Sequence, residues 1–210
     1  MRVEKLLKLL RENYPKASCS LDYKNPFELL IATILSAQCT DRRVNMVTPK
    51  LFKRFPDAEK MSKAPLDEIK EIIKSTGFYN NKAKSLKEAS NSIVKNFQGK
   101  VPSDMEKLLS LKGVARKTAN VVLSSAFGKN EGIVVDTHVK RISYRLGLTK
   151  QTNPQKIEKD LMNLIEKKDW GYFSHALVFH GRTFCFARNP KCKDCFLNNI
   201  CPKKGIVKEK

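Results

Sequence analysis

Apolar residues recur along most of the chain at the spacing of an α-helix, and alternating strand patterns are scarce. Residues 2–13, for example, place Val3, Leu6, Leu7 and Leu10 on one helical face. Further helices are expected at 57–63, 66–75, 81–96, 103–110, 115–126, 137–146, 154–167 and 171–185. Short connections rich in Gly, Pro, Asn and Asp join them, so no long flexible linker divides the chain. The pattern predicts an all-α fold.

Two helix starts carry clear local signals. Asn25 is a good N-cap, Pro26 suits the first helical position and Glu28 the third, which predicts a buried helix over FELLIATILSAQ. Thr40 and Asp41 are placed to cap the next helix. Pro49 is expected to break or kink that helix because proline lacks an N–H group.

The charge balance narrows the class of partner. Lys and Arg outnumber Asp and Glu by 41 to 21 in 210 residues, a net charge of +20. So many like charges repel one another, which favours a polyanionic partner: nucleic acid first, and a membrane surface less so. The other alternative is a soluble protein whose surface lysines are simply solvated. No apolar run reaches the roughly 18 residues of a membrane span. The N-terminal stretch contains Glu4 and Glu12 and no apolar h-region, so no targeting segment is expected.

The cysteines are distributed unevenly. Two, Cys19 and Cys39, lie far upstream. The other four follow a C-x6-C-x2-C-x5-C spacing: Cys185, Cys192, Cys195 and Cys201. This asymmetry argues against a secreted disulfide framework and favours a metal site in a reducing compartment. Only the middle pair has the spacing of a zinc knuckle, which favours a [4Fe-4S] cluster, but the spacing alone does not decide between iron and zinc.

The stretch LLSLKGVARKTANVV has the pattern of a helix-hairpin-helix. One short helix ends near Leu111, Gly113 permits the turn, and a second helix begins near Ala115, where its first amides form an anion site suited to a DNA phosphate. The expected core face of the second helix consists of Ala119, Val122, Leu123 and Ala126. Lys117 lies nearly opposite that face and is expected to face a cleft or solvent.

Lys117 and Asp136 each admit a simple and a chemical interpretation. A lysine in the first helical turn, beside Arg116, is placed to bind phosphate, but the positive end of the helix dipole also favours an uncharged, nucleophilic amine. Asp136 in GIVVDTHVKR is placed to cap a helix, and it could instead serve as a carboxylate that stabilises positive charge or handles protons. The spacing along the chain does not show whether the two residues meet.

Several motifs occur together and in order over nearly the whole chain: PFELLIATILSAQCTD, GFYNNKA, LKGVARKTANVV, VVDTHVKR, HGRTFCFAR and the four-cysteine loop. In this combination the chain resembles the endonuclease III family, bifunctional DNA glycosylases and abasic-site lyases of the helix-hairpin-helix superfamily. The resemblance implies two lobes: a central helical barrel over 20–132, and a second domain of 1–19 plus 133–210 that carries the cluster. It also implies duplex DNA with a damaged base or abasic site as the partner, with the base flipped into the cleft between the lobes.

The resemblance assigns roles to particular residues. Lys117 becomes the nucleophile that displaces an oxidised pyrimidine and forms a Schiff base, followed by β-elimination, and Asp136 becomes the catalytic carboxylate. Gln38 matches a glutamine that fills the gap left by the flipped base, and Phe78 an apolar wedge, although an isolated phenylalanine is more often core. His138 receives no catalytic role. The family's [4Fe-4S] ligands correspond to Cys185, Cys192, Cys195 and Cys201.

The hairpin departs from the family pattern at two positions. The family usually reads LPGVG, where this chain has Lys112 for the proline and Ala115 for the second glycine. The expected DNA-binding set is Lys112, Gly113, Val114, Ala115 and Arg116. Alanine suits position 115 if the backbone φ there is negative, and Lys112 adds a cation near the expected phosphate.

The adenine-specific branch of the superfamily shares the cysteine loop but differs at the lysine position and usually carries a further domain, so Lys117 argues against it. Two alternatives remain open: a glycosylase of different base specificity, and a non-catalytic DNA-binding module. The expected setting is the cytoplasm of a bacterium or archaeon, associated with the nucleoid, and the expected state is a monomer.

Overall fold

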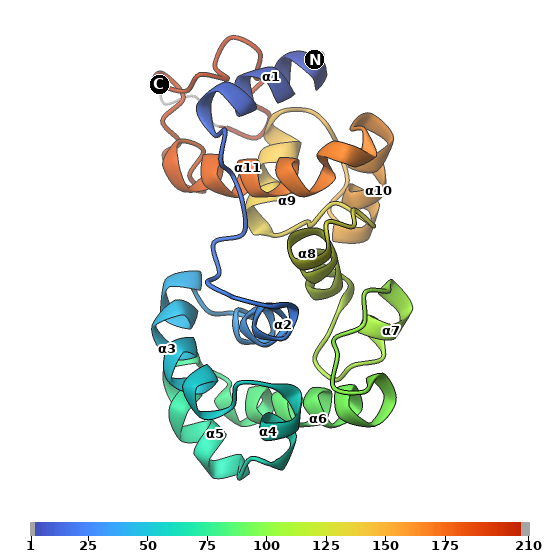
Figure 1. Cartoon of the computed structure of the whole chain (residues 1–210). Coiled ribbons are helices and arrows are strands. Elements are labelled where there is room, and N and C mark those ends of the chain that lie inside the picture. The colour runs from blue at the N-terminus through green and yellow to red at the C-terminus, as the bar shows by residue number, and fades with distance from the viewer. Residues whose placement is uncertain (1–2, 207–210) are drawn as a thin grey trace. The chain divides into compact units, whose positions relative to one another are not determined.

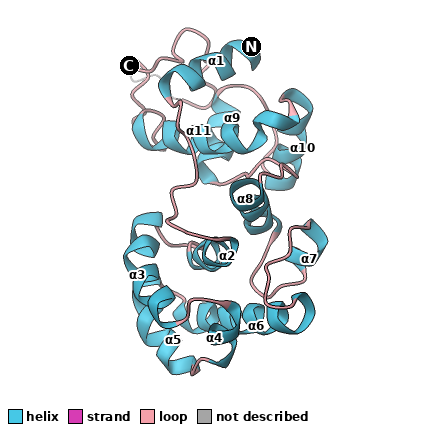
Figure 2. Cartoon of the chain, in the orientation of Figure 1, coloured by secondary structure: helices cyan, strands magenta, loops and turns pink. Residues whose placement is uncertain are grey.

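The computed structural model describes residues 3–206, and within them every regular element is a helix and none is a strand (Figure 2). The all-α prediction is confirmed. The chain divides into two compact units, Cys19–Glu131 and Met1–Ser18 with Gly132–Lys210. Within residues 3–206, no helix is both long and apolar enough to cross a bilayer.

The unit Cys19–Glu131 is built around one buried helix. Its elements are α2 (Pro26–Leu35), α3 (Asp41–Arg54), α4 (Ala58–Lys63), α5 (Leu66–Ile73), the 3-10 helix η1 (Lys74–Thr76), α6 (Tyr79–Phe97), α7 (Met105–Leu109) and α8 (Arg116–Phe127) (Figure 1). Helix α2 contacts α3, α6 and α8, and every one of its residues after Pro26 is buried. This burial on all sides follows from the run FELLIATIL, which is apolar around the whole helix.

The start of α2 matches the sequence signals. The Asn25 side chain accepts a hydrogen bond of 2.9 Å from the Glu28 N–H, and Pro26 occupies the first turn. Glu28 Oε2 in turn accepts a 2.7 Å bond from the Lys24 N–H. These two bonds satisfy amide groups that have no partner within the helix, so the predicted start is confirmed.

Pro49 does not end α3. Helix α3 continues through it from Asp41 to Arg54, so the expectation that Pro49 breaks the helix is wrong. Pro49 lies on an exposed face, and proline removes only one N–H donor, which water can replace at such a face.

The unit Met1–Ser18 with Gly132–Lys210 is centred on a long C-terminal helix. Its elements are α1 (Val3–Asn13), α9 (Thr137–Arg145), α10 (Pro154–Leu164), the 3-10 helix η2 (Lys167–Asp169) and α11 (Trp170–Thr183), followed by a loop to residue 206 (Figure 1). Helix α11 packs against α1 and α9. The shared core includes Leu6, Leu10, Val139, Ile142, Phe173 and Leu177. Arg11 of α1 also pairs with the buried Asp169 at the start of α11.

Helix α11 is shorter than predicted at its C-terminal end. It begins at Trp170 and ends at Thr183, whereas the pattern indicated 171–185. The N–H groups of Phe184 and Cys185 both bond to the His180 carbonyl, at 3.0 and 2.9 Å, and the backbone at Phe184 leaves the helix. The turn directs the chain into the cysteine loop.

Candidate active site and cysteine loop

The hairpin between α7 and α8 depends on Gly113. Its φ of +78° is a conformation that side chains disfavour, and a Cβ there would lie 2.8 Å from Cβ of Ser85 on α6 and 3.6 Å from Cγ2 of Ile34 on α2. The N–H of Val114 closes the turn with a 3.2 Å bond to the Leu111 carbonyl. Glycine is therefore required at position 113 both for its backbone conformation and for its lack of a side chain.

Ala115 stands where the family usually has the second hairpin glycine. It is the N-cap of α8 and is extended, with φ −94° and ψ 168°. Since this conformation suits any residue, alanine in place of the family's glycine carries no backbone strain here. An alanine side chain also offers no cap to the first amides of α8. Lys112, next to the turn, is exposed.

Lys117 lies where the helical pattern placed it. It is the second residue of α8 and is exposed. Ala119, Val122 and Leu123 are fully buried, as expected for the opposite face, whereas Ala126 is only partly buried. The amine of Lys117 is accessible at the helix terminus that follows the hairpin.

Gln38 and Phe78 share an unusual backbone conformation. Both are exposed, and both adopt left-handed φ values, 52° and 48°, although neither is glycine. Such residues cost about 1–3 kcal/mol each and cluster at functional sites. Phe78 is 64% exposed, so the alternative that it belongs to the core is wrong.

Lys82 supports the turn that presents Phe78. Its side chain is buried and donates a 2.8 Å hydrogen bond from Nζ to the carbonyl of Thr76, two residues before Phe78. Burial lowers the pKa of Lys82, and the neighbouring Cys39 partly opposes that shift. Lys82 was missed at the sequence level, although it is the lysine of GFYNNKA.

Asp136 is the N-cap of α9, which confirms the simple interpretation of that residue. Its Oδ1 accepts a 2.8 Å hydrogen bond from the Val139 N–H. This bond uses Oδ1 of the carboxylate. Asp136 belongs to the unit that contains the cysteine loop, and Lys117 belongs to the other unit.

Helix α9 is tied closely to the end of α11. Nδ1 of His138 lies 3.1 Å from the Arg141 guanidinium, which also donates bonds of 3.1 and 2.9 Å to the Cys185 carbonyl. Burial lowers the pKa of His138, and Arg141 and Arg182 lower it further, while Asp136 opposes them. These contacts anchor the first residue of the cysteine loop to the helix that Asp136 caps.

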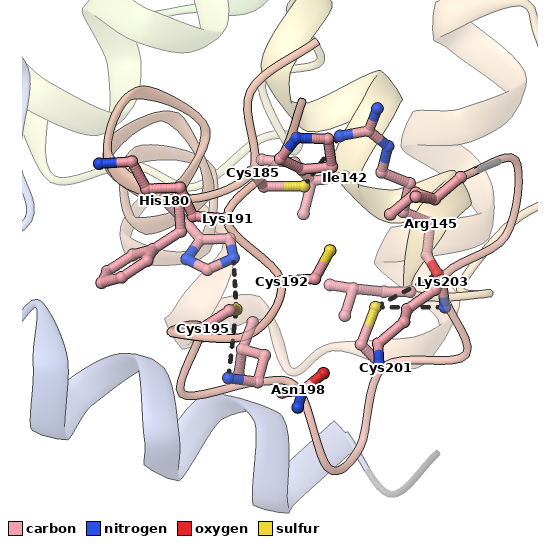
Figure 3. A pocket seen from close by; sticks show the side chains of 15 residues that line it. Ile142, Arg145, His180, Cys185, Lys191, Cys192, Cys195, Asn198, Cys201 and Lys203 are labelled. Carbon is pink, nitrogen blue, oxygen red and sulfur yellow. Dashed lines mark hydrogen bonds between the residues drawn. The ribbon is translucent and has the colours of Figure 1, made fainter. Parts of the chain in front are cut away.

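The four C-terminal cysteines surround one cavity (Figure 3). Arg145, which is buried, donates from Nη1 to Cys185 Sγ at 3.3 Å and to the Phe186 carbonyl at 2.6 Å. The N–H groups of Leu197 and Lys203 lie 3.4 Å from the sulfur atoms of Cys195 and Cys201, respectively. N–H donors of this kind stabilise thiolate ligands.

No two cysteines are joined by a disulfide in the described part of the chain. Among the same residues, no group of three His, Cys, Asp or Glu side chains lies close enough together to hold one metal ion. Burial raises the pKa of Cys195 to about 11, with the other three loop cysteines adding to the shift and the Leu197 N–H opposing it. A bound cationic centre would offset this cost because it stabilises the thiolate.

Known proteins match the chain over nearly its whole length. The model of the HhH-GPD superfamily base excision DNA repair protein matches residues 31–167. An endonuclease III of Synechocystis sp. is 57% identical over 201 residues, which cover 96% of this chain and 92% of the relative. The chain belongs to the endonuclease III family. Two solved structures, a non-covalent endonuclease III–DNA complex and a trapped covalent endonuclease III–DNA intermediate, each match with a TM-score of 0.91 and 42% identity over 96% of this chain and 94% of theirs.

In this endonuclease III family member the structure groups the expected site residues in two sets. Gln38, Phe78, Lys117 and the hairpin lie in one unit, and Asp136 and the four cysteines lie in the other. Sequence reasoning missed the side chains that hold these residues, above all Arg145 and His180. His180 belongs to the motif HGRTFCFAR, but nothing local in the sequence indicates that it contacts Cys195, 15 positions away.

Proposed function

We propose that this endonuclease III family member uses Lys117 to remove oxidised pyrimidines from duplex DNA and then to cut the abasic strand. The observation that carries the proposal is the exposed Lys117 amine at the start of α8, directly after the hairpin. It is supported by the 42% identity to an endonuclease III trapped as a covalent intermediate with DNA. The protein is a base-excision repair enzyme, a DNA glycosylase and abasic-site lyase.

The chemistry follows from an amine nucleophile. Lys117 Nζ bonds to C1′ of the sugar while the glycosidic bond breaks, and the base leaves with the bonding electrons and takes up a proton. Opening of the sugar ring converts the adduct to a Schiff base. Loss of a C2′ proton then expels the 3′ phosphate by β-elimination, and water releases Lys117. Asp136 stabilises the positive charge that develops on the sugar, and it accepts and returns the protons that are transferred in these steps.

DNA binding follows from the hairpin and the net charge of +20. The hairpin from Gly113 to Arg116 binds one backbone phosphate through main-chain N–H groups other than that of Val114, which closes the turn, and the Lys112 ammonium adds a cation close to it. Gln38 fills the gap left by the flipped base, and the exposed ring of Phe78 stacks beside it. Binding should weaken steeply as the salt concentration rises, and binding that hardly changes with salt would contradict this assignment.

The four cysteines hold a [4Fe-4S] cluster in this proposal. Four cysteine sulfurs line a shared cavity, and only the middle pair has the spacing of a zinc knuckle, which favours a [4Fe-4S] cluster over zinc. The bound cluster would fix the fold of the loop from Cys185 to Cys201. Analysis of iron and acid-labile sulfide tests the assignment, and a colourless, zinc-loaded protein would overturn it.

Borohydride trapping tests the enzymatic proposal. The protein is incubated with duplexes that carry an abasic site, an oxidised pyrimidine or a mismatch, and covalent adducts are counted. We expect adducts with the abasic and oxidised-pyrimidine duplexes, and none from Lys117→Ala, which should still bind DNA. Lys112→Ala is the matched control: it should bind more weakly but still form the adduct.

Each alternative has its own outcome in this experiment. Wild-type protein that binds but never traps would indicate a non-catalytic DNA-binding module. Adducts with the mismatched but not the oxidised duplex would indicate a different base specificity. A Lys117→Ala protein that traps as well as wild type would refute the role of Lys117.

The place of action follows from the substrate. Since the substrate is chromosomal DNA and the relatives are bacterial, we expect the protein to act at the nucleoid. We also expect it to be a monomer. Fluorescent tagging in cells and light scattering of the purified protein would check the two statements.

A further inference from the structure

His180 lies at the edge of the cysteine cavity and uses both ring nitrogens (Figure 3). Its side chain is 2% exposed on α11. Nε2 lies 3.6 Å from Cys195 Sγ, and Nδ1 lies 3.2 Å from the hydroxyl oxygen of Tyr14. A buried histidine therefore connects a proposed cluster ligand to a residue from the N-terminal segment.

The surroundings of His180 hold the ring in one orientation. The Phe196 ring packs edge-on against it with centroids 5.2 Å apart, and the Phe184 ring stacks at 5.9 Å. The Tyr14 hydroxyl lies 2.7 Å from Oγ1 of Thr183, one turn further along α11. These contacts restrain the imidazole before any ligand is bound to the cysteines.

The donors and acceptors of each group determine the direction of the hydrogen bonds that run from Thr183 through Tyr14 and His180 to Cys195. A ligating cysteine is a thiolate, which can only accept, so the proton must be on Nε2 of His180. A neutral imidazole has a single N–H, so Nδ1 accepts from the Tyr14 hydroxyl. Thr183 has a single hydroxyl proton, so in this arrangement it donates to the Tyr14 oxygen, 2.7 Å away, in place of the Phe179 carbonyl, 3.0 Å away. A Tyr14 hydroxyl that donates to Nδ1 stabilises the tautomer that donates to Cys195.

We propose that His180, oriented by Tyr14, is a positioning residue whose hydrogen bond to Cys195 raises the reduction potential of the cluster held by the four cysteines. This inference rests on the [4Fe-4S] cofactor proposed above. Hydrogen bonds to ligand sulfur favour the reduced cluster because it carries more negative charge. The Leu197 N–H also reaches Cys195, but it is a backbone group, so His180 is the donor that substitution can remove.

The test is the reduction potential of the purified, cluster-loaded protein, measured by voltammetry on the full chain. His180→Phe fills the space but has no hydrogen-bond donor. It should lower the reduction potential by about 59 mV, which for a one-electron couple is a tenfold change in the ratio of oxidised to reduced cluster. His180→Gln keeps an amide donor near the Nε2 position and should restore most of the shift. Tyr14→Phe should shift the potential in the same direction by less.

His175 provides a matched control. It lies five residues earlier on α11 and is not among the described residues that line the cavity. His175→Phe should leave the potential unchanged, whereas a shift equal to that of His180→Phe would show that any histidine loss on α11 has the same effect and would overturn the inference.

The remaining outcomes are also decisive. A fully loaded His180→Phe protein with the wild-type potential overturns the inference. If His180→Phe does not retain the cluster, two other variants take its place: His180→Asn, whose shorter amide can reach Tyr14 but not Cys195, and Tyr14→Phe. Wild-type potentials in both of these variants would also overturn the inference. Wild-type protein without iron and sulfide would instead overturn the proposed cofactor, so the two failures are distinguishable.

Discussion

The imidazole of His138 lies against Gly181 so closely that a Cβ at position 181 would be 2.3 Å from its Nδ1 atom. Helices α9 and α11 meet here, and only glycine leaves room for the histidine ring. Asp136 caps the first of these helices, and the cysteine loop begins just after the second. The contact therefore joins two elements that carry proposed functional residues.

Gly181→Ala should destabilise the protein. The added methyl group must displace His138 or Arg141, since the latter's Nη2 lies 3.0 Å from the same Cβ position. Overpacking of this kind costs about 1–3 kcal/mol, which urea denaturation would measure. In a His138→Ala background the same substitution should cost clearly less, because the ring is gone. An equal cost in both backgrounds would show that the ring is not the obstacle.

Substitutions of Asp136 should separate its cap from its chemistry. Asn is as good an N-cap as Asp, so Asp136→Asn should keep the stability of α9, whereas Asp136→Ala should lose about 0.5–2 kcal/mol. Both should lose most glycosylase activity, because neither provides a carboxylate. Denaturation and single-turnover base release would measure the two effects. Wild-type activity in Asp136→Asn would rule out a catalytic carboxylate.

Lys117 and Asp136 should also behave as one functional group. If both act on the same nucleotide, the double variant Lys117→Ala with Asp136→Asn should be hardly slower in base release than the slower single variant, because residues that act as a unit are strongly non-additive. If the double variant is instead slowed by the product of the two single-variant factors, Lys117 and Asp136 have independent roles.

Gly113→Ala should cost more than Gly128→Ala. Both positions have positive φ, 78° and 64°, so both variants carry the backbone strain of about 1–2 kcal/mol. Only position 113 adds a clash, with Ser85, whereas no described atom lies within 4 Å of a Cβ at position 128. Gly113→Ala should therefore be less stable and bind DNA more weakly. Equal losses of stability and binding in the two variants would show that φ alone determines the requirement.

His138 should make the protein less stable in mild acid. Its pKa is lowered by burial, with Arg141 and Arg182 adding to the effect against Asp136, so the folded state binds its proton less readily than the unfolded state. The free energy of unfolding should fall as the pH drops below about 6.5, the ordinary value for histidine, and should stop falling below the lowered pKa.

Thermal unfolding at pH values of about 7.5 and 5.5 would measure this dependence on both sides of that ordinary pKa. His138→Gln cannot titrate and should show a smaller loss between the two conditions. The same loss in both proteins would assign the acid sensitivity to other groups.

The helices were predictable because their signals are local. Asn25 and Asp136 cap helices through bonds to amides three residues away, and Lys117 is exposed because helical spacing places it opposite Ala119 and Leu123. Two helices differ from the pattern for local reasons. Helix α3 continues through Pro49, which lies on an exposed face, and α11 ends early because Phe184 turns the chain toward the first loop cysteine.

By itself, the sequence determined the all-helical class, the hairpin with its accessible lysine and the four-cysteine spacing, because each depends on residues close together in the chain. Only the tertiary structure decided that Phe78 is exposed, that Gly181 makes room for His138, and that Tyr14 meets His180 across 166 positions. Such contacts depend on how helices pack, and the periodicity of one helix does not specify which side chain of another will lie against it.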